Sequence, residues 1–275
     1  MSGSSAPRPG VIVLGDINVD ISACVPALPA AGEDCLVPQL ELHCGGVGAN
    51  TAAALALWGV SVRLLGAVGA DAFGDFALEY LRGQRVDVSG VERNARATTG
   101  LFFIAIQPDG QRTMYGSRGA NAVLAPLGSA QIFDGVCAGH LVGYSFLSDS
   151  GTALAEKVLE EVQRGGGWIT LDVGMAPSHQ IPQRILQAAR KVDILFASEA
   201  EAQALTGQGE PADAFAALED HGAHEVVLKL GERGCLIREC GALCDVPPCA
   251  VQAVDSTGAG DAFAAAFIHA RLQGW

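Results

Sequence analysis

Near its C-terminal end the chain combines carboxylates with a run of very small residues. The stretch Asp255-Ser256-Thr257-Gly258-Ala259-Gly260-Asp261 leads directly into an alanine-rich run over 262–272 that is typical of a helix. Glycines let backbone N–H groups approach a ligand closely, and the first turn of a helix offers unpaired N–H groups at the positive end of its dipole. Gly258, Ala259 and Gly260 therefore predict an anion hole for a phosphate or a developing oxyanion.

A carboxylate beside an anion hole is unexpected, because it repels the anion that the hole would bind. Asp261 occupies that position at the end of the glycine stretch. The arrangement makes sense if Asp261 takes the proton of a hydroxyl that attacks the phosphate. We therefore expect a phosphoryl-transfer site with Asp261 as its catalytic base, and we expect the start of the helix to lower the pKa of this carboxyl.

The composition limits the classes of function that fit. The 275 residues, 49% of them hydrophobic, are ample for one large core. A formal net charge of −13 argues against nucleic acids and anionic membrane surfaces as partners. No run approaches the roughly 18 apolar residues of a membrane span, and the N-terminus lacks the apolar core of a signal peptide. We expect a cytoplasmic protein whose residues 1–9 form a disordered tail.

Eight cysteines are present, and none of them forms a Cys-x-x-Cys pair. Those between Cys235 and Cys249 fall on a predicted pair of strands with a turn, where a zinc site is one alternative. We favour reduced cysteines that pack as small apolar residues.

Polar residues follow the first predicted strand, Val11–Leu14. Asn18 and Asp20 alternate there with apolar residues, so they share one face of an extended segment. In open α/β sheets ligands bind at this end of the strands, and a carboxylate accepts hydrogen bonds from two hydroxyls at once. The pair is a candidate sugar site, and ordinary turn residues are the alternative.

A glycine pair, Gly45 and Gly46, precedes a small-residue helix predicted over 51–58. It allows a hinge or a close approach of the backbone to a ligand, and Asn50 could either cap the helix or bind substrate. The spacing does not match a dinucleotide-binding fingerprint, and the chain has no P-loop motif.

A hairpin is predicted over 101–106 and 111–115, joined by Gln107-Pro-Asp-Gly110. With strands expected within 17–25 and 35–43 it would form a small β appendage beside the main sheet. Arg118 follows the hairpin, and it could reach an anionic group of a substrate or form a surface salt bridge.

From residue 140 the pattern becomes a regular alternation, which predicts a parallel sheet with helices on both faces. The expected strands are 140–146, 168–173, 193–197 and 225–230, and the expected helices are 151–164, 182–190, 199–206 and 211–221.

Two stretches within this alternation carry further candidate residues. Glu199 and Glu201 open a helix, where they would stabilise its dipole or hold Mg²⁺ through water. Gly231 and Gly234 form a turn after Lys229, which could let the backbone lie against a nucleotide.

In this order the signals resemble the PfkB/ribokinase family of carbohydrate and nucleoside kinases, from about residue 10 to the end. The motifs that carry the resemblance are GDINVD at 15–20, GGVGAN at 45–50, SEAEAQALTG at 198–207, LKLGERG at 228–234 and DSTGAGD at 255–261. The resemblance implies an α/β fold with three layers, α/β/α, around a mostly parallel sheet. It also implies one kinase domain over 10–275, with a β lid from about 17–44 and 98–118.

The implied activity is transfer of the γ-phosphate of ATP to a hydroxyl of a small sugar, sugar acid or nucleoside. Mg²⁺ is the implied cofactor, with K⁺ in some members, and the lid implies a homodimer contact in several members. The family pattern makes Asp261 the base and Gly258–Gly260 the anion hole. It implies sugar binding by Asn18, Asp20, Gly45, Gly46 and Asn50, nucleotide binding by Ser198, Lys229, Gly231 and Gly234, water-mediated Mg²⁺ binding by Glu201, and a monovalent cation at Asp255 and Thr257.

The chain departs from the pattern of ribokinases at the acceptor. Val47 stands where ribokinases have lysine, Ser198 stands where many members have asparagine, and Tyr144-Ser145-Phe146 lacks the glutamate that binds ribose. These departures argue against ribose as the substrate, and Arg118 would favour a sugar acid or a ketohexose.

The chain also ends one helix after Asp261, whereas the family continues with helices that complete the adenine pocket. A catalytically impaired sugar- or nucleotide-binding protein of the same fold is therefore the alternative to a kinase. An NAD-dependent oxidoreductase is disfavoured because the dinucleotide fingerprint is missing.

Overall fold

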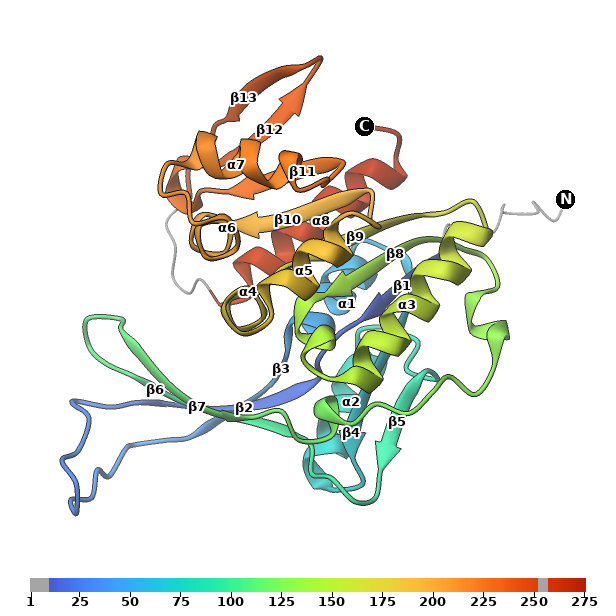
Figure 1. Ribbon diagram of the computed structural model, residues 1–275. Helices are drawn as coiled ribbons and strands as arrows, with labels where there is room; N and C mark the ends of the chain where they lie inside the picture. The colour runs from blue at the N-terminus through green and yellow to red at the C-terminus, as the bar shows by residue number, and fades with distance from the viewer. Residues whose placement is uncertain (1–9, 252–256) are drawn as a thin grey trace, which may run out of the picture.

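The computed structural model describes residues 10–251 and 257–275, so the expected disordered tail and Asp255 lie outside the described residues. Its centre is a nine-stranded sheet (Figure 1). The strands follow one another across the sheet as β13 (Ala242–Val246), β12 (Cys235–Glu239), β11 (Glu225–Lys229), β10 (Ile194–Ser198), β9 (Trp168–Asp172), β8 (Val136–Val142), β1 (Gly10–Leu14), β4 (Ser61–Gly69) and β5 (Val91–Asn94). Neighbours are parallel from β5 to β11, and β12 and β13 add an antiparallel edge.

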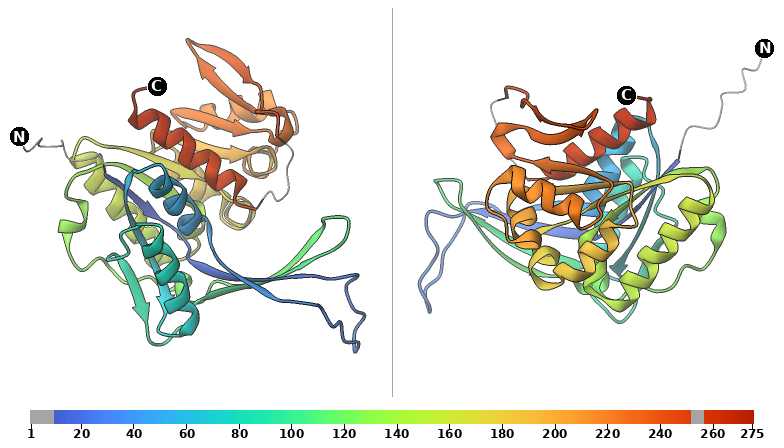
Figure 2. Two further views of the ribbon diagram at one scale, coloured as in Figure 1. Left: turned by 180° about the vertical axis from the view of Figure 1, so that it is seen from behind. Right: turned by 45° about the horizontal axis from the view of Figure 1, so that its top comes forward.

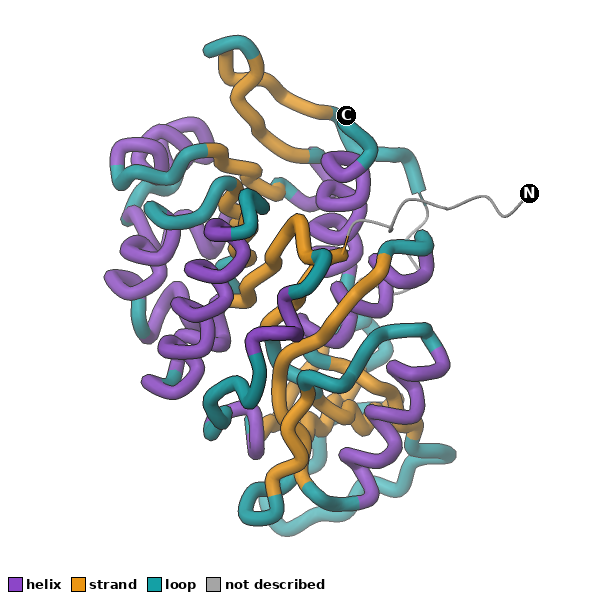
Figure 3. The backbone as a smooth tube through the Cα atoms, turned by 90° about the vertical axis from the view of Figure 1, so that its right-hand side faces the viewer, coloured by secondary structure: helices purple, strands orange, loops and turns teal. Residues whose placement is uncertain are grey.

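Helices cover both faces of this sheet, which confirms the three-layer α/β/α fold (Figures 2 and 3). One face packs against α1 (Val47–Leu57), α2 (Ala72–Gly83) and α8 (Ala259–Leu272). The other packs against α3 (Asp149–Arg164), α5 (Pro182–Ala189), α6 (Glu199–Thr206) and α7 (Pro211–Asp220), with the short α4 (Met175–Gln180) beside α6. In the described part of the chain no helix is long and apolar enough to cross a membrane.

Strand β1 shows why the central strands are continuously apolar. Val11 and Val13 join the core on the side of α1 and α2, whereas Ile12 and Leu14 join the core on the side of α3. Successive side chains of a strand point to opposite faces, so a strand covered on both sides must be apolar at every position.

A second sheet of four strands projects from the body (Figure 1). Its order is β3 (Glu41–Gly45), β2 (Asn18–Cys24), β6 (Gly100–Ile106) and β7 (Arg112–Ser117). The predicted hairpin is confirmed as β6 and β7, which pair antiparallel. The strand expected over 35–43 is present as β3, but it begins only at Glu41. Pro38 lies in the unpaired stretch, and proline has no N–H to donate to a strand partner.

Other boundaries also differ from the sequence expectation. The strand expected over 140–146 ends at Val142, and a 3-10 turn follows over Gly143–Leu147. The chain is so close to its neighbour there that a Cβ on Gly143 would overlap the carbonyl oxygen of Val173. Two elements were not predicted, β5 and α4, because both are short and neither shows a clear apolar period.

Candidate active site

Polar residues gather at the carboxyl ends of the parallel strands. Asp16 follows β1, Asp172 ends β9, Ser198 ends β10 and Lys229 ends β11. Parallel strands deliver these ends to one edge of the sheet, and the order of the strands reverses between β1 and β8. Ligands of open α/β sheets bind at such a point.

The glycine stretch forms the start of α8. Gly258 has a φ of 72° and is the N-cap of the helix, and Ala259, Gly260 and Asp261 make up its first turn. No side chain caps this end, so the first backbone N–H groups can face a ligand. The predicted anion hole is therefore the positive end of a helix of 14 residues.

Asp261 is buried beside this helix start, with 9% of its surface exposed. Asn50 Nδ2 donates a hydrogen bond to Asp261 Oδ2 at 2.8 Å. The expected low pKa is wrong, because burial raises the pKa of Asp261 to about 6, with Asn50 acting in the opposite direction. A helix dipole changes a charge's energy by about 0.3–1 kcal/mol, whereas burial shifts a pKa by up to about 3–5 units.

Asn50 does not cap α1, which was one of the two roles considered for it. The N-cap is Gly46, and Asn50 lies inside the helix. Helix α1 packs against α8, and this contact brings the side chain of Asn50 to Asp261. Because Asn50 and Asp261 are 211 residues apart, no local sequence pattern could reveal this pair.

Lys229 and Asp172 form a buried ion pair next to Asp261. Lys229 Nζ lies 2.9 Å and 3.0 Å from the two carboxylate oxygens of Asp172. A Cβ on Gly260 would be 3.4 Å from the same Nζ, so the ammonium lies at the first turn of α8. Asp172 is not among the residues predicted from the sequence, although Trp168–Asp172 shows a carboxylate at the end of an otherwise apolar strand.

Ser198 and Glu201 form a capping box at the start of α6. The backbone N–H of Ser198 donates to Glu201 Oε2 at 2.7 Å, and the backbone N–H of Glu201 donates to Ser198 Oγ at 3.3 Å. Burial and the neighbouring Asp172 raise the pKa of Glu201, while Lys229 acts to lower it. Glu201 thus both stabilises its helix and lies within the charged cluster.

The described residues contain no group of three or more metal-binding side chains that could enclose an ion. Mg²⁺ is usually bound in nucleotide sites by one or two carboxylates, with waters and phosphates filling the remaining positions. The buried carboxylate of Glu201 fits this kind of site.

At the other end of the site the polar groups are paired with one another. Arg118 donates from Nε and Nη2 to both carboxylate oxygens of Asp16, at 2.8 Å and 2.7 Å. Arg118 thus forms the salt bridge that was one alternative, but the pair is largely buried, since the side chains are only 18% and 8% exposed. Asn121 Nδ2 donates to Asn18 Oδ1 at 2.9 Å, which fixes the amide of Asn18. Asp16 and Asn121 were not identified from the sequence.

The glycine pair lets β3 and α1 approach this paired network. A Cβ on Gly45 would overlap the carboxylate of Asp20. Gly46 has a φ of 95°, and a Cβ there would overlap the carbonyl oxygen of Asp16. Glycine is required at Gly46, where the neighbour is backbone and φ is positive, whereas a side chain on Gly45 would displace the carboxylate of Asp20.

A cavity of about 560 Å³ lies between the four-stranded sheet, α1 and the start of α8. Asp20 and His43 line it from β2 and β3, and Asn50 and Gly258 line it from the body. Burial raises the pKa of Asp20, and His43 partly offsets this effect. Arg112 on β7 donates to the hydroxyl of Thr257, which links the four-stranded sheet to the glycine stretch.

The remaining candidates lie nearby without forming a contact that defines a role. Gly231 has a φ of 61° in the turn after Lys229, with open space around it. Gly234 has a φ of 89°, and a Cβ there would overlap the carbonyl of Val246 on β13, which accounts for that glycine by packing. The nucleotide-binding roles of these two residues stay predictions.

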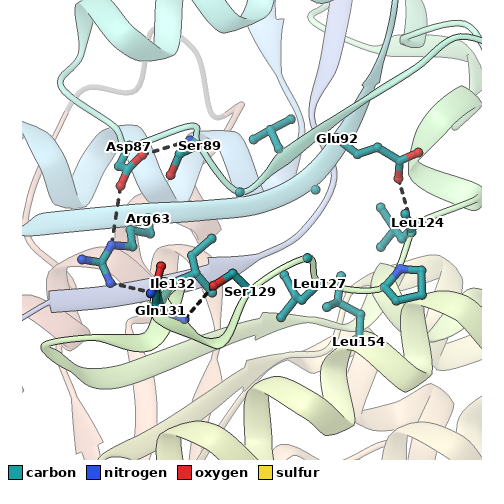
Figure 4. Close-up of a pocket in the computed structure, with 16 residues that line it drawn as sticks. Arg63, Asp87, Ser89, Glu92, Leu124, Leu127, Ser129, Gln131, Ile132 and Leu154 are labelled. Atoms are coloured by element: carbon teal, nitrogen blue, oxygen red, sulfur yellow. Dashed lines mark hydrogen bonds and ion pairs between the residues drawn. The ribbon is translucent and has the colours of Figure 1, made fainter.

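A second cavity of about 560 Å³ lies between β4, β5 and the segment 124–132 (Figure 4). Its charged groups bond to the protein itself. Arg63 reaches Asp87 and the carbonyl of Ile132, and Glu92 accepts from the backbone N–H of Ala125. None of the sequence-predicted site residues lines it, so the cavity beside Asp20 is the candidate active site.

Comparisons with known proteins agree with this geometry. A family model described as pfkB family carbohydrate kinase matches residues 8–275. A ribokinase of Haemophilus influenzae is 28% identical over 97% of this chain and 86% of its own length. A 2-dehydro-3-deoxygluconokinase of Thermoproteus tenax is 31% identical over 96% of this chain and 82% of its own length.

The fold has solved counterparts with nucleotide bound. An Escherichia coli protein described as a ribokinase II, in complex with ATP and Mg²⁺, superposes with a TM-score of 0.83 at 26% identity. The match covers 97% of this chain and 87% of that chain. The chain therefore belongs to the pfkB family of carbohydrate kinases, and it is an ATP-dependent phosphotransferase with a sugar hydroxyl as acceptor.

Proposed function

We propose that this protein is a cytoplasmic kinase that transfers the γ-phosphate of ATP to a hydroxyl of a small, uncharged, hydroxyl-rich acceptor. The observation that supports it most strongly is the buried carboxylate of Asp261 at the uncapped start of α8. That combination supports the assignment of a proton acceptor beside an anion site.

The preference for an uncharged acceptor follows from the charges at the acceptor end. Asp20 lines the cavity and Asp261 lies beside it, and both would repel a carboxylated acceptor. The charge of Arg118, the residue expected to attract such a group, is already matched by the carboxylate of Asp16, to which its Nε and Nη2 donate. A sugar or nucleoside hydroxyl can instead donate to these carboxylates.

At the acceptor, we assign Asp20 and Asn18 to the sugar hydroxyls and Asp261 to the attacking one. Asp261 takes the proton of that hydroxyl, and Asn50 holds its carboxylate in place through the 2.8 Å hydrogen bond. The pKa of about 6 suits this role, because a general base works best when its pKa lies near the operating pH.

At the phosphates, the first turn of α8 and the ammonium of Lys229 face the charge that develops during transfer. Phosphoryl transfer has a loose transition state, so positioning and charge stabilisation matter more than a strong base. Glu201 would hold Mg²⁺ through water, and the ion neutralises part of the charge of ATP. Ser198, Gly231 and Gly234 are assigned to the nucleotide from their place in the family pattern.

The four-stranded sheet is proposed to close over the acceptor and exclude water, which would suppress hydrolysis of ATP. Arg112 at its edge already contacts Thr257. A homodimer through this sheet and a monovalent cation at Asp255 and Thr257 complete the proposal. Sedimentation of the protein with and without β7 surface substitutions tests the dimer, and activity in K⁺ compared with tetramethylammonium tests the cation.

The experiment is an assay of ADP release with ATP and Mg²⁺ over a panel of neutral sugars, sugar acids and nucleosides. We expect acceptor-dependent release with a neutral sugar or nucleoside, and little with sugar acids. Turnover confined to sugar acids would contradict the acceptor class. Acceptor binding without ADP release at any ATP concentration would contradict the kinase itself.

A further inference from the structure

The Lys229–Asp172 pair joins two strands that are not neighbours. In the sheet register Lys229 stands beside Ser198 and Asp172 beside Phe196, with the whole of β10 between them. The lysine side chain therefore crosses β10 to reach the carboxylate, and it meets both oxygens at 2.9 Å and 3.0 Å. The two side chains are 16% and 7% exposed.

This crossing fixes a group that is otherwise flexible. A lysine side chain carries about 2 kcal/mol of rotamer entropy, and a free ammonium would sample many positions. Bonding to both oxygens of Asp172 leaves the ammonium at the first turn of α8, beside Gly260. Glu201 and Asp261 also attract it, so without Asp172 the ammonium would shift toward those residues.

We propose that Asp172 is a positioning residue for phosphoryl transfer, which holds the Lys229 ammonium where it stabilises the charge on the transferring phosphoryl group. This inference rests on the proposed kinase function. In this proposal Asp172 acts through Lys229, to which both of its carboxylate oxygens are bonded.

The pair also acts on the base. The groups that face Asp261 are Asp172 from β9, Lys229 from β11, Glu201 from α6 and the amide of Asn50 from α1. Asp172 and Glu201 raise the pKa of Asp261, whereas Lys229 and Asn50 lower it. Removing either member of the ion pair should therefore move the acidic limb of the pH profile, in opposite directions.

The test compares Asp172→Asn, Lys229→Met and the double variant with the wild type, after thermal unfolding shows that each one folds. We expect Asp172→Asn to lower kcat about 100-fold, as for a misplaced catalytic group, with KM for the acceptor unchanged. Lys229→Met should lower kcat about 100- to 1,000-fold. The double variant should be no slower than Lys229→Met, because residues that act as a unit are not additive.

The pH dependence of kcat/KM gives a readout that a purely structural role would not move. Asp172→Asn should shift the acidic limb to lower pH and Lys229→Met to higher pH. Multiplicative losses in the double variant would overturn the inference. So would a raised Mg²⁺ requirement in Asp172→Asn with kcat intact, since that result would make Asp172 a metal ligand.

The wild-type protein shows whether the kinase assignment itself fails, separately from the positioning role of Asp172. If no acceptor of the panel gives turnover with wild-type protein, the proposed function fails. The same variants are then compared by titration with ADP, Mg²⁺ and aluminium fluoride, which mimics the transferring group. A tenfold weaker binding in Asp172→Asn would support the positioning role, and equal binding in all variants would overturn it.

Discussion

The acceptor end and the transfer end of the site differ in whether their buried charged groups are balanced by a partner. At the acceptor end Asp16 is matched by Arg118 through two hydrogen bonds, and the amide of Asn18 is held by Asn121. These groups are satisfied before any ligand binds. The acceptor end is thus already organised, and its geometry should change little on binding.

At the transfer end the carboxylates of Asp172, Glu201 and Asp261 surround the ammonium of Lys229. Burial and mutual repulsion raise the pKa of Glu201 and of Asp261. An excess of buried negative charge is unfavourable for the fold, but it attracts a divalent cation and it makes Asp261 a better base. We infer that the paired groups of the acceptor end stabilise the fold, whereas the excess negative charge of the transfer end serves phosphoryl transfer.

Asp261→Asn tests the transfer end and has the largest expected effect. An amide cannot take the proton of the attacking hydroxyl, so kcat should fall about 100- to 10,000-fold. Acceptor-dependent ADP release measures it. Asp213 is the matched control, because it is an exposed acidic residue in the first turn of α7. Equal activity in Asp261→Asn and Asp213→Asn would remove Asp261 from the mechanism.

Arg118→Met tests the acceptor end. It leaves the buried carboxylate of Asp16 without its partner, which should lower the free energy of unfolding by about 3–5 kcal/mol in urea denaturation. The matched control is Arg93→Met, which breaks an exposed pair with Asp75 and should cost no more than about 1 kcal/mol. Equal losses in the two variants would show that the Asp16–Arg118 pair is not a special feature of the acceptor end.

A double variant sharpens this prediction. Asp16→Asn combined with Arg118→Met removes both buried charges, so much of the lost stability should return. A double variant that is less stable than Arg118→Met alone would contradict the explanation that the loss comes from an unpaired buried charge.

Asp261→Asn should also stabilise the fold, in contrast to its effect on activity. The pKa of Asp261 is raised from 3.8 to about 6 in the folded state. Such an acid destabilises the fold above its unfolded pKa, and the effect is complete above pH 6. We expect the variant to gain up to about 3 kcal/mol at pH 8, and the gain should disappear as the pH falls toward 4. Urea denaturation at the two pH values measures it, and a gain independent of pH would contradict the assigned cause.

Asn50→Ala has the smallest expected effect. Its amide donates to Asp261 and lowers the pKa of that carboxyl. Without it the acidic limb of kcat/KM should move to higher pH at saturating ATP. A limb that stays in place, or moves to lower pH, would show that Asn50 does not act on the base.

The sequence was sufficient for the fold and for the glycines. Gly45 and Gly46 stand out in the sequence as an adjacent pair before a helix, and in the structure they pack against Asp20 and Asp16. The regular alternation after residue 140 predicted the parallel sheet. Asp261 was identified because it directly follows the predicted anion hole, where a carboxylate would repel the bound anion.

The rest of the site depended on contacts between distant parts of the chain. Arg118 and Asp16 are 102 residues apart, and Lys229 and Asp172 are 57 apart. Neither pair leaves a local signal, so the partner of each cation was missed. The pKa of Asp261 was predicted in the wrong direction because the sequence displays the helix start but not the burial.

The most direct test of the account is the pH dependence of kcat/KM of the wild-type enzyme with its best acceptor. We expect an acidic limb with a midpoint near pH 6, set by the buried carboxyl of Asp261. Activity that continues undiminished to about pH 5, with a midpoint near pH 4 as expected for an ordinary aspartate, would contradict the claim that burial at the transfer end makes Asp261 the base.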